Sequence, residues 1–332
     1  MSLVAGVDSS TQSVKVVVRD AETGAWVREA RAPHPDGTEV DPAAWITALD
    51  TVLDGILDGV EALSIAGQQH GMVVLDESGA VIRPALLWND TRSAPDALDL
   101  IAELGGPAAW ADAVGSVPVG EVSGTGYWSP ATGEYRADLV HLALGHVPAL
   151  PRVAGPGEAI GETAAGILLG PGTGDNMGAA LALDVQPGDV VVSLGTSGTA
   201  FAGSAQPTAD ASGLVAGFAD ASGHFLPLVC TLNAARVLSS AAALLGVDLN
   251  ALADLARAAE PGSGGLTLLP YLDGERTPNL PDARGSLHGI TRANLTPQNI
   301  ARASIEGMLG GLADAVDALI SVGVQPRRIL LV

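Results

Sequence analysis

One pattern occurs twice in this chain: an apolar strand runs into a turn of small hydroxyl residues and returns at once as a second strand. The first copy places its turn between apolar stretches at residues 3–7 and 14–18, and the second places the turn 195–199 after a stretch at 190–194. Each copy is typical of two antiparallel strands. A chain of 332 residues is long enough for two cores. The repeat therefore predicts two α/β domains built on one plan.

The first domain should contain several strands and one helix. Its strands are predicted at residues 3–7, 13–19, 25–32, 62–66 and 72–75. Asp41 can cap a helix, Pro42 suits the first helical position, and apolar residues then recur at helical spacing up to Ile56. Three antiparallel strands, a helix and another strand make an α/β domain without an uninterrupted βαβ series. In the second domain, strands are expected near Phe218 and at 224–229, followed by a helix at 233–245.

Charge and composition exclude several classes of function. Acidic residues outnumber basic ones by 37 to 16, which gives a formal net charge of −21. Such a charge repels phosphate over long distances, so we expect neither a general nucleic-acid binder nor a protein of anionic membrane surfaces. No apolar run approaches the ~20 residues of a membrane span. Cys230 is the single cysteine, so no disulfide forms within the chain, and we expect a cytoplasmic protein.

Each hydroxyl turn has the composition of a phosphate site. We call Ser10–Ser13 the first turn and Gly195–Gly198 the second turn. Backbone N–H groups and hydroxyls can reach phosphate oxygens there, because no bulky side chain stands in the way. Asp8 is placed to hold a hydrated magnesium ion, and Lys15, the only lysine, can offset phosphate charge. An ordinary hairpin with its polar turn in water explains either turn alone, but two turns at equivalent points favour phosphate binding.

Seven segments of the chain form an ordered set. They are GVDSSTQSVKV, AGQQHGMVVLD, RPALLWNDTRS, GPGTGDNMGAA, SLGTSG, LPYLDGERTP and GSLHGITRANLTPQNIARASIEG. In this order they resemble the motifs of the carbohydrate kinases named FGGY. In the last segment, the resemblance implies a helix that ends at Glu306. Each motif alone is moderately specific, whereas all seven in order are a strong sign of the family.

The resemblance implies a fold and a reaction. The fold would be two domains of the actin and hexokinase type, also called ribonuclease H-like, around a cleft. We expect residues 1–187 to bind sugar and carry the catalytic base, and residues 188–332 to bind nucleotide, with the phosphates gripped between the domains. The reaction would transfer the γ-phosphoryl group of ATP, with Mg²⁺, to a primary hydroxyl of a sugar. Asp175 would be the general base on that hydroxyl, and Asp8 would bind the metal.

The resemblance also implies which residues hold the substrates. The cofactor-binding set comprises Ser10, Thr11, Gln12, Ser13, Lys15, Gly195, Thr196, Ser197 and Gly198. The sugar-binding set, which supplies the convergent donors and acceptors that a polyol needs, comprises Gln69, His70, Asp175 and Asn176. GQQHG followed by LLWND is similar to the branch that phosphorylates D-xylulose. The expected partners are D-xylulose and MgATP, without nucleic acid or membrane, and a homodimer is the assembly considered.

Residues beside these motifs have two interpretations each. Trp88 can form a wall of the sugar pocket or pack in the core, with equal weight. Asn89, Asp90 and Arg92 can support the sugar loop or only cap and pair locally. Arg276, in GERTP, can approach phosphate or lock its loop, and we favour the second role.

A different enzyme class is the next interpretation. Gly172, Gly174 and Gly178 imitate the glycine turn of a dinucleotide-binding site, which would make the protein an NAD-dependent oxidoreductase. Such a turn normally begins a domain and is followed by a parallel strand that ends in an acidic residue. A meander follows here instead, so this interpretation is disfavoured.

The sequence departs from the family in two respects. A segment of helix and strand is missing near residues 120–121, and no adenosine motif follows the final strand, PRRILLV, so the second domain is incomplete. One explanation is a deletion product that survives as a sugar sensor or a catalytically dead, sugar-binding relic. The other is that the natural protein has further residues. We expect the latter, because uncovered apolar faces and an open strand edge favour aggregation.

Overall fold

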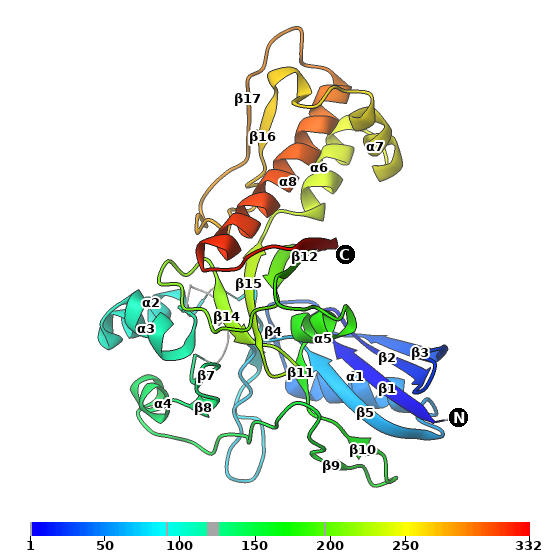
Figure 1. Cartoon of the computed structure of the whole chain (residues 1–332), viewed down its shortest axis with the longest axis vertical. Helices are drawn as coiled ribbons and strands as arrows, with labels where there is room; N and C mark the ends of the chain where they lie inside the picture. The colour runs from blue at the N-terminus through cyan, green and yellow to red at the C-terminus, as the bar shows by residue number, and fades with distance from the viewer. Residues whose placement is uncertain (1, 91, 118–125, 196) are drawn as a thin grey trace. The chain divides into compact units, whose positions relative to one another are not determined.

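The computed structural model describes residues 2–90, 92–117, 126–195 and 197–332 (Figure 1). The expected junction at 120–121 and the predicted site residue Thr196 lie outside these ranges. The chain forms two compact units, unit 1 with Met1–Asp184 and Ala219–His224, and unit 2 with Val185–Phe218 and Phe225–Val332. The expected ranges 1–187 and 188–332 differ from this division, and the roles attached to them stay predictions. Each unit is described by itself.

Unit 1 is built on a seven-stranded sheet with the order β3-β2-β1-β5-β10-β9, in which β11 also pairs with β5. The strands β1 (Leu3–Ser9), β2 (Ser13–Asp20) and β3 (Trp26–Pro33) form the predicted antiparallel meander. β5 (Val60–Gly67) lies parallel to β1. Alternate valines of β2 are fully buried and pack with residues of α1 (Pro42–Leu53), because successive side chains of a strand point to opposite faces.

The remaining elements of unit 1 are short. They are β4 (Glu39–Val40), β6 (Ala85–Leu86), α2 (Ala94–Leu104), α3 (Pro107–Val114), β7 (Trp128–Ser129), β8 (Glu134–Tyr135), α4 (Ala137–Leu144), β9 (Gly161–Glu162), β10 (Leu168–Leu169), β11 (Thr173–Gly174) and α5 (Asp175–Ala182). A second cluster of buried side chains, around Trp110, joins α2, α3 and α4 through Ile101 and Leu139.

Two local predictions for unit 1 were wrong. The helix α1 begins as expected, with the Asp41 side chain accepting a hydrogen bond from the N–H of Ala43 (2.9 Å), but it ends before Ile56. Gly55 adopts a left-handed conformation with φ +68° and turns the chain there. The expected strand at 72–75 is absent from the described structure apart from one bridge at Leu75, because this stretch is an exposed loop.

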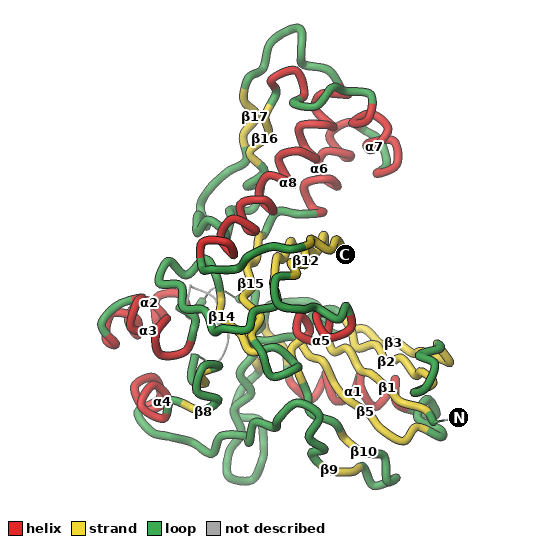
Figure 2. Tube along the Cα trace, in the orientation of Figure 1, coloured by secondary structure: helices red, strands yellow, loops and turns green. Residues whose placement is uncertain are grey.

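Unit 2 contains a five-stranded sheet with the order β14-β15-β13-β12-β18 (Figure 2). The strands are β12 (Asp189–Leu194), β13 (Gly198–Ala202), β14 (Ala216–Ala219), β15 (Phe225–Thr231) and β18 (Arg328–Leu331). β13 is antiparallel to both β12 and β15, which confirms the second meander, and β18 is parallel to β12. β18 is an edge strand, and its Ile329 and Leu331 are 54% and 68% exposed.

Helices cover one end of unit 2. The other elements are α6 (Ala235–Leu245), α7 (Leu249–Arg257), a 3₁₀ turn (Ser263–Gly265), β16 (Thr267–Leu269), β17 (Ser286–His288) and α8 (Pro297–Ser321). α8 does not end at Glu306 as expected, because buried residues continue at helical spacing through Met308, Leu312, Ala315 and Leu319, and the last three pack against the sheet. Within the described residues no single helix is long and apolar enough to span a membrane. Taken together, α6 and α7 have the length and apolar composition of a span, but they are bent by 87° at their break.

Candidate active site

Three parallel strands of unit 1 end side by side. Asp8 of β1 is followed by Ser9, which lies beside Gly67 of β5, and Gly174 of β11 lies on the other side of Gly67. Asp175 follows β11 directly and begins α5. Because the carboxyl ends of parallel strands share one edge of a sheet, this edge brings together Asp8 and Asp175, which the sequence analysis had assigned to metal and catalysis.

Asp175 is held in an environment that favours its neutral form. Its side chain is half-buried, and this burial raises the pKa of the carboxyl group. Hydrogen bonds from the backbone N–H (2.8 Å) and the side-chain Nδ2 (3.1 Å) of Asn176 oppose the rise, whereas the negative charge of Asp8 adds to it. A carboxylate with a raised pKa is a stronger base than an ordinary aspartate, which is what proton abstraction from a hydroxyl requires.

The carboxylate of Asp8 is open to a ligand. Part of its side chain is exposed, yet burial of the remainder raises its pKa, against the positive charges of Lys15 and Arg31. Nothing in the described ranges donates a hydrogen bond to it. Those ranges also contain no cluster of three or more side chains that could hold a metal. A carboxylate open to a ligand suits Mg²⁺, which proteins often hold with one or two carboxylates, water and substrate phosphates.

Lys15 lies directly opposite Asp8 in the register of β1 and β2. Its Nζ pairs with Glu29 Oε2 at 3.1 Å, and both side chains are nearly half exposed. An exposed pair of this kind contributes little to stability. Lys15 can therefore exchange Glu29 for a phosphate oxygen at small energetic cost.

The first turn is held by hydrogen bonds within the turn and by hydrogen bonds from Arg31 and His34. Ser10 donates from its N–H (3.0 Å) and its Oγ (3.1 Å) to the carbonyl of Ser13. Arg31 Nε donates to Ser13 Oγ (3.0 Å). His34 donates from its backbone N–H to Gln12 O (2.9 Å) and from Nδ1 to Ser10 O (2.8 Å). Arg31 lies in β3 and His34 directly after it. Neither was predicted at this site, because no local pattern indicates that they reach back to this turn.

The loop after β5 carries Gln69 and His70. A Cβ on Gly174 would lie 2.5 Å from Gln69 Cδ, so the glycine leaves room for this side chain beside the residue that precedes Asp175. Among the described residues, none provides a hydrogen-bond partner for the buried Oε1 of Gln69, and such an atom needs a donor. His70 has a φ of 77°, a conformation that costs a non-glycine residue energy and is often found at ligand sites.

Asp90 and Arg92 belong to a structural network. Asp90 is only 4% exposed and accepts hydrogen bonds from Thr38 Oγ1 (2.7 Å) and Arg92 Nε (2.9 Å). Arg92 also pairs with Glu39 at 2.9 Å. Asn89, by contrast, is exposed. These contacts favour the local-pairing interpretation of this segment.

The second turn joins β12 and β13. The N–H of Ala235 donates to Gly195 O (3.0 Å), which ties the turn to the start of α6. A Cβ on Gly198 would lie 2.6 Å from Thr231 Oγ1 and from Leu312 Cδ2, so a larger residue would have to push these side chains aside. The turn thus has a glycine where β13 packs most closely, while Thr196 lies outside the described residues.

Glu275 anchors the GERTP loop, in which the sequence analysis had considered only Arg276. Glu275 is 3% exposed and accepts hydrogen bonds from the N–H of Leu232 (2.7 Å), the N–H of Arg276 (2.8 Å) and Nδ2 of Asn233 (2.9 Å). Asn233 also donates to Gly274 O (2.7 Å). These bonds hold the loop to the segment that leads into α6 and so to the second turn. An acidic residue in a polar loop gives no sequence signal of such burial.

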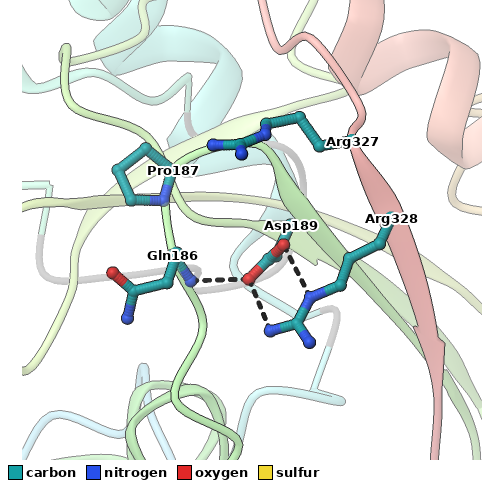
Figure 3. A pocket seen from close by; sticks show the side chains of 5 residues that line it. All are labelled: Gln186, Pro187, Asp189, Arg327 and Arg328. Atoms are coloured by element: carbon teal, nitrogen blue, oxygen red, sulfur yellow. Dashed lines mark hydrogen bonds and ion pairs between the residues drawn. The ribbon is translucent and has the colours of Figure 1, made fainter.

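A cavity of about 560 Å³ lies elsewhere in unit 2. It is lined by Gln186, Pro187, Asp189, Arg327 and Arg328. Figure 3 shows Asp189 accepting two hydrogen bonds from Arg328 (2.8 and 2.9 Å) and one from the N–H of Gln186 (2.8 Å). Asp189 and Arg328 begin β12 and β18, whereas the second turn follows the other end of β12. The cavity is therefore separate from the candidate phosphate site.

Comparison with known proteins identifies the family. The model for the N-terminal domain of the FGGY family of carbohydrate kinases matches residues 3–113, and the model for the C-terminal domain matches residues 190–332. The chain belongs to the FGGY family of carbohydrate kinases. The predicted family, the two-domain actin- and hexokinase-like fold and the carbohydrate-kinase class are thereby confirmed, and the oxidoreductase interpretation was wrong.

Two curated relatives and a solved structure resemble this FGGY kinase over almost all of its length. Xylulose kinase of Streptomyces coelicolor is 41% identical over 388 positions and that of Streptomyces rubiginosus 42% over 392, each covering 99% of this chain and 79% of the relative. The crystal structure of xylulose kinase from Bifidobacterium adolescentis is 41% identical, with a TM-score of 0.89, and the match covers 100% of this chain and 84% of that one. The alignments with the two Streptomyces relatives are longer than the 332 residues of this FGGY kinase, so these relatives contain internal residues that it lacks.

Proposed function

We propose that this FGGY kinase transfers the γ-phosphoryl group of ATP to D-xylulose and forms D-xylulose 5-phosphate. Two relatives named xylulose kinase, 41% and 42% identical along 99% of the chain, support the substrate. The structural observation that carries the proposal is the proximity of Gln69 to the start of α5, where Asp175 has a raised pKa. One sugar hydroxyl needs a proton acceptor and another can donate to the unpartnered Gln69 Oε1.

Asp175 is proposed as the general base. Both hydrogen bonds from Asn176 end on Asp175 Oδ1, which leaves Oδ2 to accept a proton. As the primary hydroxyl oxygen attacks the γ-phosphorus, its proton passes to Oδ2, the new P–O bond forms, and the bond to the ADP oxygen breaks. General-base catalysis contributes about 10²–10⁴ in rate, and positioning and charge stabilisation are expected to contribute most of the remainder.

The phosphate groups are proposed to bind the two turns. In unit 1, the first turn presents backbone N–H groups and the Thr11 hydroxyl, and Lys15 adds a positive charge beside Asp8. Asp8 would hold Mg²⁺, which when bound neutralises phosphate charge and orients the phosphates. In unit 2, we assign the second turn, including Gly195, the same phosphate-binding role.

The proposed sugar site comprises Gln69, His70, Asp175 and Asn176. Gln69 contributes a buried oxygen without a partner, and the backbone of His70 has a conformation that costs energy. Asn176 donates a hydrogen bond to Asp175, and its amide oxygen can accept a hydrogen bond from a sugar hydroxyl. The proposed partners are accordingly D-xylulose and MgATP. A cytoplasmic location and a homodimer are part of the proposal, and the single cysteine agrees with a reducing compartment.

The deciding experiment measures ADP release by the purified protein with MgATP. D-xylulose is compared with glycerol, L-ribulose, gluconate and no sugar, and Asp175→Ala is the inactive control. We expect rapid release with D-xylulose alone. Preferential release with another of these sugars would keep the kinase reaction and overturn the substrate. A folded protein that binds D-xylulose without releasing ADP would instead be a sugar-binding relic.

A further inference from the structure

The indole of Trp88 reaches the first turn. Its Nε1–H donates a hydrogen bond of 2.8 Å to Thr11 Oγ1, and both residues are partly buried. Trp88 lies just after β6 in the segment LLWND, far from Thr11 in the sequence. The contact therefore links two motifs, one assigned to the sugar loop and the other to phosphate.

The bond settles what the Thr11 hydroxyl can do. The hydroxyls of Ser10 and Ser13 already take part in hydrogen bonds within the turn and to Arg31. A threonine hydroxyl has one proton to donate and two acceptor sites. Because Trp88 occupies an acceptor site of Thr11, the hydroxyl is turned so that its proton points elsewhere. The proton is thus available to donate to an anion at the turn.

The same segment also touches the sugar loop. A Cβ on Gly71 would lie 3.4 Å from the carbonyl oxygen of Leu86, an ordinary van der Waals distance, so the end of GQQHG lies beside β6, two residues before Trp88. The segment from Leu86 to Trp88 thus lies between the loop that carries His70 and the first turn at Thr11. Movement of the sugar loop can therefore change the geometry of the first turn.

We infer that Trp88 is a positioning residue for phosphate: its indole N–H orients the Thr11 hydroxyl and couples sugar binding to nucleotide binding. The nucleotide part rests on the proposed kinase function, whereas the hydrogen bond itself does not. Coupling of this kind is reciprocal, so each substrate should tighten binding of the other by the same factor. The mechanism requires only that sugar favour the loop geometry in which Trp88 contacts Thr11.

The hydrogen bond is tested without turnover by labelling the five tryptophans with ¹⁵N. The indole signal that disappears in Trp88→Phe is that of Trp88. Thr11→Val should shift this signal toward that of an indole without the bond, and Thr11→Ser should leave it in place. D-xylulose, and separately MgADP, should also shift it. A Trp88 signal that has the same position in Thr11→Val and in the wild type would overturn the inference, whether or not the protein is a kinase.

The functional role is tested by the kinetics of the same variants. Loss of one neutral hydrogen bond corresponds to about fivefold, so Trp88→Phe should raise the KM for MgATP about fivefold. Because the coupling is reciprocal, the KM for D-xylulose at saturating MgATP should rise as well, whereas the affinity for D-xylulose without nucleotide should change less than about twofold. Trp88→Phe combined with Thr11→Val should be no worse than Thr11→Val alone. Additive effects, or a loss of D-xylulose affinity without nucleotide as large as the rise in the KM for MgATP, would contradict the role.

A matched control separates positioning from loss of stability. Trp110 is also buried, and its Nε1 donates to Leu100 O (3.1 Å) within the α2–α3 cluster. Trp110→Phe should lower the unfolding midpoint without changing the KM for MgATP. If the wild-type protein phosphorylates no sugar, the proposed function fails, and calorimetric binding of MgADP with and without D-xylulose still decides the coupling: equal affinities in the wild type would overturn it.

Discussion

Asp8 and Asp175 interact through their charges at the edge of the unit 1 sheet. Burial raises the pKa of Asp175, and the negative charge of Asp8 raises it further. The charge of Asp8 thus affects the pKa of Asp175, although the two residues belong to motifs that are far apart in the sequence. Their proximity makes the pH dependence of the reaction a test of the assigned roles.

The acid limb of the kcat/KM profile should lie above the pKa of about 3.9 of an ordinary aspartate. Asp175 must be ionised to act as a base, and its raised pKa means that protonation begins at higher pH. Asp8→Asn removes the neighbouring charge, so the limb measured on the residual activity should move to lower pH. Asp58→Asn, before the start of β5, is the control and should leave the limb unchanged. Movement to higher pH in Asp8→Asn would contradict the assignment.

Asp175→Asn should lower kcat by about 10²–10⁴. The amide keeps the size of the side chain but cannot accept a proton from the sugar hydroxyl. Binding of D-xylulose, measured by calorimetry without ATP, should remain detectable, because Gln69 and His70 are unchanged. A loss smaller than tenfold, in a variant whose circular dichroism matches that of the wild type, would remove Asp175 from the role of base.

Gly174→Ala should weaken sugar binding. The new Cβ would lie 2.5 Å from Gln69 Cδ, so Gln69 must move away from the start of α5. Displacement of this size costs about 1–3 kcal/mol, and we expect the KM for D-xylulose to rise about tenfold or more. Gly6→Ala is the matched control in β1, where nothing lies within 4 Å of the added atom. Equal KM values in the two variants would show that Gln69 does not contact sugar.

Glu275→Gln should destabilise unit 2 by about 2 kcal/mol. Every recorded partner of the Glu275 carboxylate is an N–H donor, so the amide nitrogen of glutamine would face a donor and leave it unpaired. Urea unfolding would measure the change. Asp273→Asn is the control, since Asp273 is 60% exposed and pairs with Arg236 only at 3.6 Å. It should change the free energy of unfolding by less than about 0.5 kcal/mol. A stable Glu275→Gln variant would show that the loop is held by other contacts.

Local patterns predicted the strands of four residues or more, whereas the two- and three-residue strands were missed. Alternating valines in β2 and the cap at Asp41 act over a few residues, so the meander and the start of α1 could be read directly. The ends of helices were harder to predict. α8 continues past Glu306 because its later residues are buried by the sheet, and that burial depends on tertiary packing.

The candidate site could be predicted only where its residues lie in motifs. Asp8, Asp175 and Gln69 were singled out in this way, and the structure places all three in unit 1 near the ends of adjacent strands. His34 and Glu275 were missed, because their importance comes from hydrogen bonds to residues distant in the sequence. A single sequence contains no signal for such contacts.

Lys15, which pairs with Glu29 and lies in register with Asp8, is the single lysine among the 332 residues of this sequence. A reagent that modifies lysine amines therefore has one lysine to modify within these 332 residues. Isotopic dimethylation of Lys15 would retain its positive charge and yield one lysine resonance. A composition that is poor in lysine thus supplies a single-site spectroscopic reporter beside the first turn.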